Sequence, residues 1–282
     1  MSIAAKGLWY IDSHCRTPMK IGDAAAAAGV SRYHFARAFT YAVGMSPRRY
    51  LRRRRVALAW EAIEGGAQDL LTVALDVGYG SHEAFSRAFR AELGVTPEQA
   101  RAQGLPPTTH IQAAIRYEEL IMSTPLDVRV EERKAFRIAG LERLHDDMPS
   151  PLISEQWQRF APHIGQIPNQ VGMTSYGAMP PEKEHEEAPY RYLCAVEVSS
   201  LEGLPDGLTG YDVEAGTYAI AQHRDHVSSV GQSFAALYGS WLPASGYEPL
   251  PGYCLEVYGA AFDPMTGNGG FELWVPVRSK SS

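Results

Sequence analysis

Two arginines, Arg37 and Arg87, stand at matching places in two similar stretches of the sequence. An offset of 50 residues aligns FARAF at 35–39 with FSRAF at 85–89, and GMSP at 44–47 with GVTP at 94–97. An arginine on an exposed helix face can donate two hydrogen bonds to guanine O6 and N7 in the major groove of DNA. Two matching arginines in a repeated unit therefore favour DNA reading over an ordinary solvated side chain.

Each copy of the repeat is predicted to be two helices joined by a short glycine turn. In the first copy, residues 21–28 form a helix, Gly29 breaks it, and Ser31 caps a second helix that runs through Phe39. In the second copy, residues 71–77, the turn 78–80, Ser81 and a helix through Phe89 play the same parts. The phenylalanines of each second helix are four apart and face the core, whereas the arginines lie about 200° around the axis. The pattern predicts two helix-turn-helix units.

A basic segment connects the two units. Residues 48–63 have helical spacing of apolar side chains, and six of the eight residues from 48 to 55 are arginines. This helix is predicted to hold the units apart and to contact DNA phosphates without reading sequence, while some of its arginines pair with acidic partners.

The net charge differs between the first and the second part of the chain. Residues 1–110 carry 14 basic and 9 acidic side chains, whereas residues 111–282 carry 12 and 23. A basic first part is expected to bind nucleic acid, and 282 residues are enough for two domains. No apolar run is long enough for a membrane span and no signal peptide is recognisable, so the expected location is the cytoplasm, with reduced, structural cysteines.

The acidic part has a different periodicity. Pro125 follows a predicted short connecting helix at 111–122, which places the domain boundary near residue 124. Beyond it, strands and helices recur in the same order twice, which predicts an α+β domain with a mostly antiparallel sheet and two pseudo-repeated halves. The predicted strands are 127–131, 136–144, 171–176, 190–198, 218–223, 253–258 and 271–277, and the predicted helices are 153–164 and 228–242.

One predicted strand, 253–258, carries a carboxylate among apolar neighbours. Alternation places Glu256 on one face with Cys254 and Tyr258, opposite Leu255 and Val257. Burying this charge without a partner would be costly. Two explanations remain open. In the first, this face of the sheet is solvated or the charge is paired with an arginine such as Arg278. In the second, Glu256 lies at the base of an aromatic pocket that binds a cation.

Residues 17 to about 103 resemble the DNA-binding domain of the AraC/XylS family of bacterial transcription regulators. The first unit has Gly29-Val30-Ser31 and then Gly44-x-Ser46-Pro47, and residues 78–89 match Gly-Phe-x-Ser-x-x-x-Phe-x-Arg-x-Phe with Tyr79 for Phe. The resemblance implies that one chain binds adjacent major-groove segments about 34 Å apart. Ala36 departs from the pattern, since alanine can touch only a thymine methyl group. The implied base-reading residues are Arg32, Tyr33, Ala36, Arg37, His82, Glu83, Ser86 and Arg87, and the expected phosphate contacts are Arg48, Arg49 and Arg52.

Residues 125–278 resemble the GyrI-like effector-binding domain. The matching stretches are the helix pattern Trp157-x-x-Phe160, SWLPASGY at 240–247, LEVY at 255–258 and ELWVPV at 272–277. The resemblance implies an aromatic cleft that binds lipophilic cations, with Glu256 as its anionic centre and Tyr258 and Trp274 as its walls. Further candidate ligand contacts are Trp157, Phe160, Tyr176 and Tyr192.

The sequence thus predicts two domains, 1–110 all-α with a double helix-turn-helix and 125–282 GyrI-like, joined by a linker at 111–124. The expected function is sequence-specific transcription regulation by a protein that is not an enzyme. It is expected to bind promoter DNA, a small lipophilic cationic effector and, where it activates transcription, RNA polymerase.

Two alternatives stay open: a DNA-binding protein whose second domain is a hydrolase with Glu256 as general base, and an architectural protein with a vestigial pocket. No cofactor or metal is expected, because His223-x-x-His226 has no third ligand in sequence and no phosphate-binding or dinucleotide motif occurs.

Overall fold

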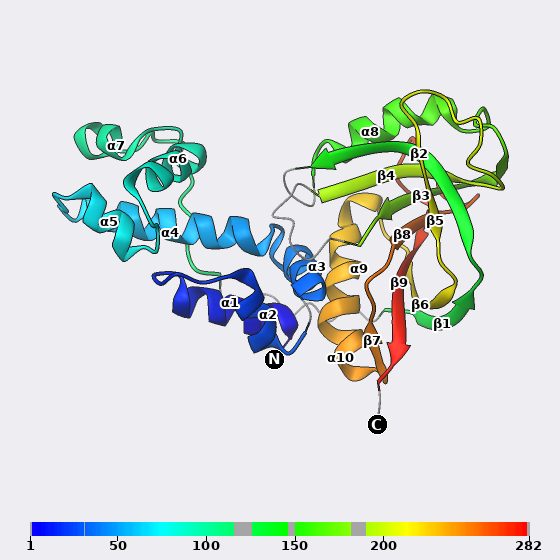
Figure 1. Cartoon of the computed structure of the whole chain (residues 1–282), viewed down its shortest axis with the longest axis horizontal. Helices are drawn as coiled ribbons and strands as arrows, with labels where there is room; N and C mark the ends of the chain where they lie inside the picture. The colour runs from blue at the N-terminus through cyan, green and yellow to red at the C-terminus, as the bar shows by residue number, and fades with distance from the viewer. Residues whose placement is uncertain (1, 31, 116–125, 146–149, 182–189, 281–282) are drawn as a thin grey trace. The chain divides into compact units, whose positions relative to one another are not determined.

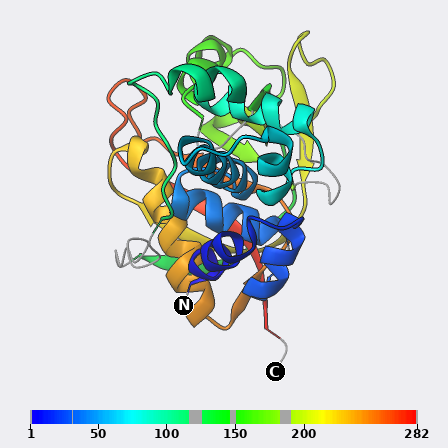
Figure 2. The same cartoon turned by 90° about the vertical axis from the view of Figure 1, so that its left-hand side faces the viewer.

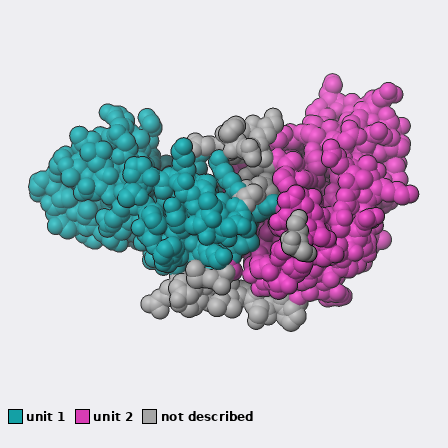
Figure 3. Space-filling model, turned by 60° about the horizontal axis from the view of Figure 1, so that its bottom comes forward, with its two compact units in different colours: residues 1, 3–39, 45–121 teal, residues 2, 40–44, 122–282 magenta. Residues whose placement is uncertain are grey.

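The computed structural model describes residues 2–30, 32–115, 126–145, 150–181 and 190–280, without the side chain of Tyr33. The chain divides into two compact units, coloured in Figure 3. Residues 3–39 and 45–121 belong to the first unit, and residues 40–44 and 122–282 to the second. None of the helices in the described ranges is long and apolar enough to cross a membrane.

The N-terminal region is helical throughout (Figure 1). Helix α4 lies between two groups of helices, as Figures 1 and 2 both show. The helices are α1 (Ile3–His14), α2 (Ile21–Ala28), α3 (Arg32–Val43), α4 (Pro47–Glu64), α5 (Leu70–Asp76), α6 (His82–Leu93) and α7 (Pro97–Gln103). The double helix-turn-helix predicted from the sequence is confirmed, and α1 is a helix that the repeat did not reveal.

The repeat in the sequence is a repeat in the structure. Helices α3 and α6 each have 12 residues and begin 50 positions apart. The turns before them contain Gly29 and Gly78 at φ of 75° and 81°, a left-handed conformation that glycine adopts without steric cost. In α6, the Ser81 hydroxyl accepts a hydrogen bond from the backbone N–H of Ala84 at 3.2 Å and caps the helix.

The C-terminal region contains an antiparallel sheet in the order β1-β6-β9-β8-β3-β4-β2-β5, with β7 paired to β9. Strands β1–β4 with helix α8 form the first half, and β5, β6, β8 and β9 with α9 form the second, so the predicted pseudo-repeat is confirmed. The strands are β1 (Val128–Arg133), β2 (Phe136–His145), β3 (Gln170–Met179), β4 (Tyr190–Val198), β5 (Thr209–Val213), β6 (Gly216–His223), β7 (Tyr247–Pro249), β8 (Cys254–Tyr258) and β9 (Phe271–Ser279). The helices are α8 (Ile153–Phe160), α9 (Val230–Ala236) and α10 (Leu242–Ala244).

Both helices α8 and α9 pack on the same face of this sheet, which we call the helix face. The indole N–H of Trp157 on α8 donates to the hydroxyl of Tyr192 on β4, and His223 on β6 hydrogen-bonds Ser233 on α9. The strand register places Tyr192, His223 and Glu256 on this same face. The opposite face carries a separate apolar cluster that includes Tyr218, Leu255 and Trp274.

The differences from the predicted elements are local. Strands β5 and β7 were not predicted, because they are short and lack alternating apolar residues. Residues 111–115 are not helical, and the rest of the predicted connecting helix lies outside the described residues.

Candidate functional site

The predicted DNA-reading residues occupy α3, α4 and α6, with different exposures. Arg87 is exposed on α6, whereas the matching Arg37 on α3 is only 8% exposed, and so is Ala36. Arg32, Arg48, Arg52 and Glu83 are exposed, and Arg49, His82 and Ser86 are half-buried. Base reading by Arg87 therefore needs no change in its surroundings, whereas a groove contact by Arg37 stays a prediction.

On α6, His82 and Ser86 already have partners within the domain. The His82 Nε2 atom lies 3.0 Å from the Glu98 carboxylate at the start of α7, and 3.5 Å from the Ser86 hydroxyl. A base contact by either side chain would have to replace or share these interactions.

The arginine-rich half of α4 serves largely to hold the domain together. Arg52 and Arg53 both pair with the buried carboxylate of Glu92 on α6, at 2.5 and 2.9 Å. Arg55 donates to the backbone carbonyls of Cys15 and Thr17. The expectation that some arginines pair within the protein is confirmed, and phosphate contact by Arg48, Arg49 and Arg52 stays a prediction.

We expect Arg87→Ala to weaken binding to a specific duplex by about 1–3 kcal/mol, roughly 5- to 150-fold, because a bidentate arginine–guanine contact would be lost. The duplex is selected from a random pool by the wild-type protein, and affinity is measured by fluorescence anisotropy at fixed salt. Arg101→Ala is the matched control, because Arg101 is exposed on α7 and donates to the Gln68 carbonyl. Equal losses in both variants would contradict base reading by Arg87.

The second unit contains a buried carboxylate, Glu256, in the middle of β8. Its side chain lies on the helix face and is 7% exposed. Two phenols donate to its Oε2 atom, Tyr192 from β4 at 2.5 Å and Tyr258 from β8 at 2.9 Å. The hydroxyl of Tyr192 in turn accepts from the indole of Trp157 at 3.2 Å. These side chains form what we call the Glu256 centre.

Burial and the charge of Glu256 act on both tyrosines of this centre. Burial, followed by the charge of Glu256, raises the pKa of Tyr192 and of Tyr258 well above the usual value for tyrosine. The same two causes raise the pKa of the buried Cys194 thiol on β4. The phenols therefore stay protonated and keep donating to the carboxylate at neutral pH.

Gly177 on β3 provides the space for this arrangement. It is the residue opposite Glu256 in the strand register, and a Cβ atom at this position would collide with the Tyr192 hydroxyl and the Glu256 carboxylate. Sequence reasoning did not identify it, because a glycine in a strand becomes informative only when its cross-strand partners are known.

If a cation binds at Glu256, as the sequence predicts, Gly177→Ala is expected to weaken that binding by at least about tenfold, because the tyrosine–carboxylate hydrogen bond must break or shift. Calorimetric titration with tetraphenylphosphonium measures this loss. Gly231→Ala is the control, because a Cβ atom at Gly231 on α9 would meet no neighbouring atom. Unchanged affinity in Gly177→Ala would show that the tight approach of these side chains is irrelevant to binding.

Aromatic rings surround the Glu256 centre on the helix face. The ring of Trp157 meets that of Tyr258 edge to face at 5.4 Å, and Phe160 packs beside Trp157 at 6.0 Å. Phe262 and Phe271 each lie 4.6 Å from the ring of Tyr258. These two phenylalanines were missed by sequence reasoning, since Phe262 lies in a loop without periodicity and the face of Phe271 depends on strand register.

Two predicted ligand contacts, Tyr176 and Trp274, are not part of this centre. Tyr176 is paired with Val257 and Trp274 with Leu255, so both side chains lie on the opposite face of the sheet from Glu256. There Tyr176 donates to Glu197 at 3.3 Å and Trp274 donates to Glu272 at 2.8 Å. The structure therefore brings together Trp157, Phe160, Tyr192, Glu256 and Tyr258, and separates the other two from them.

Among the described residues, nothing supports the simpler explanation for Glu256. All five residues of β8 are buried, so the sheet face is not open to solvent, and Arg278 pairs instead with Glu248 on β7 at 2.5 Å. The two histidines considered as metal ligands also have other partners: His223 bonds Ser233 and the carbonyl of His226, and His226 bonds Ser228. Among the described residues, no group of three or more His, Cys, Asp or Glu side chains could hold a metal ion. The three cysteines are free and buried.

Comparison with known proteins matches both units. A model described as a GyrI-like small molecule binding domain matches residues 126–278, and a helix-turn-helix domain model matches residues 24–103. The right origin-binding protein of Escherichia coli K12 is 25% identical over 285 residues, and the match covers 96% of each chain. The transcriptional regulator Rob of Salmonella typhimurium is 23% identical over 280 residues, again 96% of each chain. The transcriptional regulator BrlR of Pseudomonas aeruginosa is 29% identical over 154 residues, which are 54% of this chain and 56% of BrlR.

The double helix-turn-helix and the domain that follows it together define a DNA-binding transcription regulator with a small-molecule-binding domain. The chain belongs to the GyrI-like family, and its DNA-binding domain is of the AraC type, in the same order along the chain as in Rob.

Proposed function

We propose that this regulator senses a small lipophilic cation at the Glu256 centre and responds by changing its affinity for promoter DNA. The observation that carries the proposal is a buried carboxylate, 7% exposed, that accepts hydrogen bonds from two phenols and is surrounded by aromatic rings. A carboxylate attracts a cation strongly in such an environment, because little water screens the charge. Aromatic faces add cation–π attraction and exclude strongly hydrated ions such as Na⁺.

The burial of Glu256 also limits which ligands can bind. A cation must come close to the carboxylate past Trp157 and Tyr258, whose rings pack against each other. A ligand with large aromatic or alkyl surface recovers the free energy of separating these rings through its own apolar contacts. A small hydrated cation cannot, so the site is expected to select ligands by both charge and apolar area.

The geometry favours a sensor over a hydrolase. Hydrogen bonds donated to a carboxylate stabilise its ionised, proton-accepting form and oppose protonation. In the Glu256 centre both phenols serve this purpose, and their raised pKa values keep them protonated. A general base must instead take up a proton from water during the reaction. We therefore propose that Glu256 is a charge centre and that the protein is not an enzyme.

On the DNA side, we propose that α3 and α6 read bases and that Arg48 and Arg49 contact phosphates, with Arg87 as the main base-reading residue of α6. The exposed position of Arg87 supports this assignment. If the regulator activates transcription, RNA polymerase is a further partner. Because promoter DNA lies in the bacterial cytoplasm, we propose that the protein acts there.

The test is a calorimetric titration of the full chain with tetraphenylphosphonium, with rhodamine 6G, and with tetraphenylmethane in a co-solvent as the neutral analogue. Each ligand is recovered afterwards and examined by mass spectrometry. Binding of both cations without the neutral analogue, and recovery of intact ligand, is the expected result. Equal binding of the neutral compound would contradict charge selection, and a chemically altered ligand would establish the hydrolase instead.

A further inference from the structure

A charged group inside the helical unit, Asp12, is held between two side chains of α4. The Asp12 carboxylate on α1 accepts from the Tyr50 hydroxyl at 2.8 Å through Oδ2, and from Arg54 Nε at 2.9 Å through Oδ1. Tyr50 is fully buried, and burial raises the pKa of its phenol well above the usual value. The hydroxyl therefore remains a donor to Asp12, and the carboxylate orients both Tyr50 and Arg54.

The same two side chains of α4 hold the segment 111–115, which we call the strap. Arg54 donates through Nη1 to the Gln112 carbonyl at 2.9 Å, and the backbone N–H of Ile115 donates to the Tyr50 hydroxyl at 3.2 Å. The strap has no helical or strand hydrogen bonds of its own. Its attachment to α4 thus depends on two side chains that one carboxylate orients.

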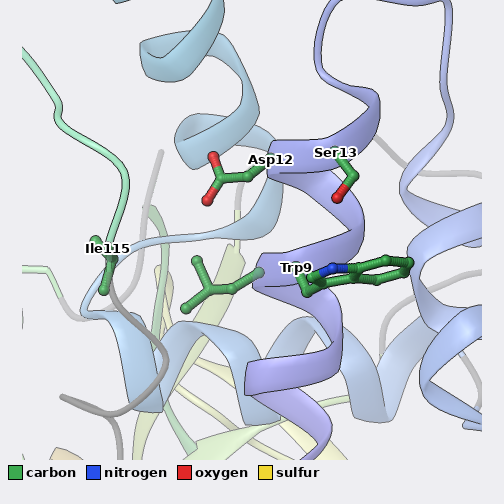
Figure 4. Close-up of a pocket in the computed structure, with 5 residues that line it drawn as sticks. Trp9, Asp12, Ser13 and Ile115 are labelled. Carbon is green, nitrogen blue, oxygen red and sulfur yellow. The ribbon is translucent and has the colours of Figure 1, made fainter.

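Figure 4 shows the space beside this attachment. Ile115 on the strap faces α1 across a pocket of about 270 Å³, which is also lined by Leu8, Trp9, Asp12 and Ser13. Trp9 is 58% exposed there. An open pocket means that few apolar contacts hold the strap against α1. Its attachment therefore rests on the two hydrogen bonds to α4 and on the packing of Ile111 against the core of the helical unit.

The strap is the last described part of the chain before the second unit. Ten residues, 116–125, separate Ile115 from the start of the GyrI-like match at residue 126. Ten residues can reach at most about 36 Å, whereas fifteen, counted from residue 111, can reach about 54 Å. Attachment or release of the strap therefore changes how closely the effector domain is tethered to the DNA-binding domain, and with it their effective concentration.

We propose that Asp12, Tyr50 and Arg54 form a latch that fixes the strap to the DNA-binding domain and couples the effector domain to DNA binding. The coupling rests on the proposed function, since it requires that a cation changes DNA affinity. With the latch closed, the ligand state of the effector domain acts through a short tether. With the latch open, the longer tether lowers the effective concentration of one domain at the other by about twofold, so the coupling weakens while each domain still binds its own ligand.

Two variants open the latch from opposite sides. Tyr50→Phe keeps the buried ring but removes the hydroxyl, and Ile115→Pro removes the backbone N–H donor on the strap together with the Ile115 side chain. Tyr79→Phe is the matched control, because the Tyr79 hydroxyl is also buried in this domain but has no hydrogen-bond partner among the described residues. Hydrogen–deuterium exchange of peptides covering 111–115 reports the latch, and DNA affinity of the full chain with and without tetraphenylphosphonium reports the coupling.

In Tyr50→Phe we expect exchange of the Ile115 amide to rise by about tenfold, because its hydrogen bond to the Tyr50 hydroxyl is lost, and we expect no change in Tyr79→Phe. In both latch variants, the effect of tetraphenylphosphonium on DNA affinity should fall to less than half of the wild-type ratio, while calorimetric binding of the cation is unchanged. Wild-type exchange of the strap in Tyr50→Phe, or an undiminished cation effect with an opened strap, would overturn the latch. A wild-type protein that binds the cation without any change in DNA affinity would overturn the coupling and the proposed function together, whatever the exchange data show.

Discussion

Phe89→Ala is expected to lower the free energy of unfolding of the helical unit by about 3–5 kcal/mol. Phe89 is fully buried on α6 and packs against Phe85 with ring centroids 5.5 Å apart. It belongs to a core cluster that also includes Trp60 on α4 and Val73 on α5. Removal of the ring leaves a cavity that helices on three sides cannot close without moving.

Urea denaturation followed by helical circular dichroism measures this effect. Arg90→Ala, at the next position on the exposed surface of α6, is the control and should change stability by no more than about 0.5 kcal/mol. A loss below about 1 kcal/mol in Phe89→Ala would mean that α6 does not dock on α4 and α5 as described. The specific DNA affinity should fall in parallel, because α6 presents Arg87.

Glu256→Gln is expected to weaken the binding of tetraphenylphosphonium by about 2–5 kcal/mol, roughly 30-fold or more. The variant keeps the size and the accepting oxygen of the side chain, so Tyr192 can still donate to it. What disappears is the negative charge in a region that water reaches poorly. Loss of binding would therefore report charge and not shape.

The two faces of the sheet supply a matched control for this experiment. Glu272 on β9 is also a carboxylate beside an aromatic ring, but the strand register places it on the face opposite Glu256. Glu272→Gln removes the same charge from the same domain and should leave cation affinity within about twofold. Similar losses in both variants would show that the domain attracts the cation by its overall charge and not at a defined site.

The architecture could be predicted from the sequence where periodicity and repetition were strong. The 50-residue repeat reports two copies of one supersecondary unit, and α3 and α6 begin at the matching residues Arg32 and His82. Phenylalanines at helical spacing located the core, because only one face of a helix can dock on its neighbours. Strand β4 was predicted with its observed ends, Tyr190 and Val198, since a run of apolar and aromatic residues interrupted only by Arg191 and Glu197 marked it.

The candidate site was less predictable, because it depends on which strands are neighbours and in which register. Glu256 was found from alternation within one strand, but its partner Tyr192 comes from a strand that is separated from β8 by β3. A shift of one residue in register exchanges the faces, and the resemblance that grouped Tyr176 and Trp274 with Glu256 carried no information on register. The arginines of α4 were also only partly predictable. A run of arginines predicts phosphate contact, but the carboxylates of Asp12 and Glu92, with which several of them pair, lie far away in the sequence.

The most direct test of regulation measures one equilibrium in two proteins. A duplex selected by the wild-type protein is titrated with wild type and with Glu256→Gln, each with and without saturating tetraphenylphosphonium, at one salt concentration. Wild type should show a change in DNA affinity of at least about fivefold when the cation binds, and Glu256→Gln should bind DNA with no response to the cation. An equal response in both proteins, or none in wild type despite bound cation, would contradict a sensor centred on Glu256.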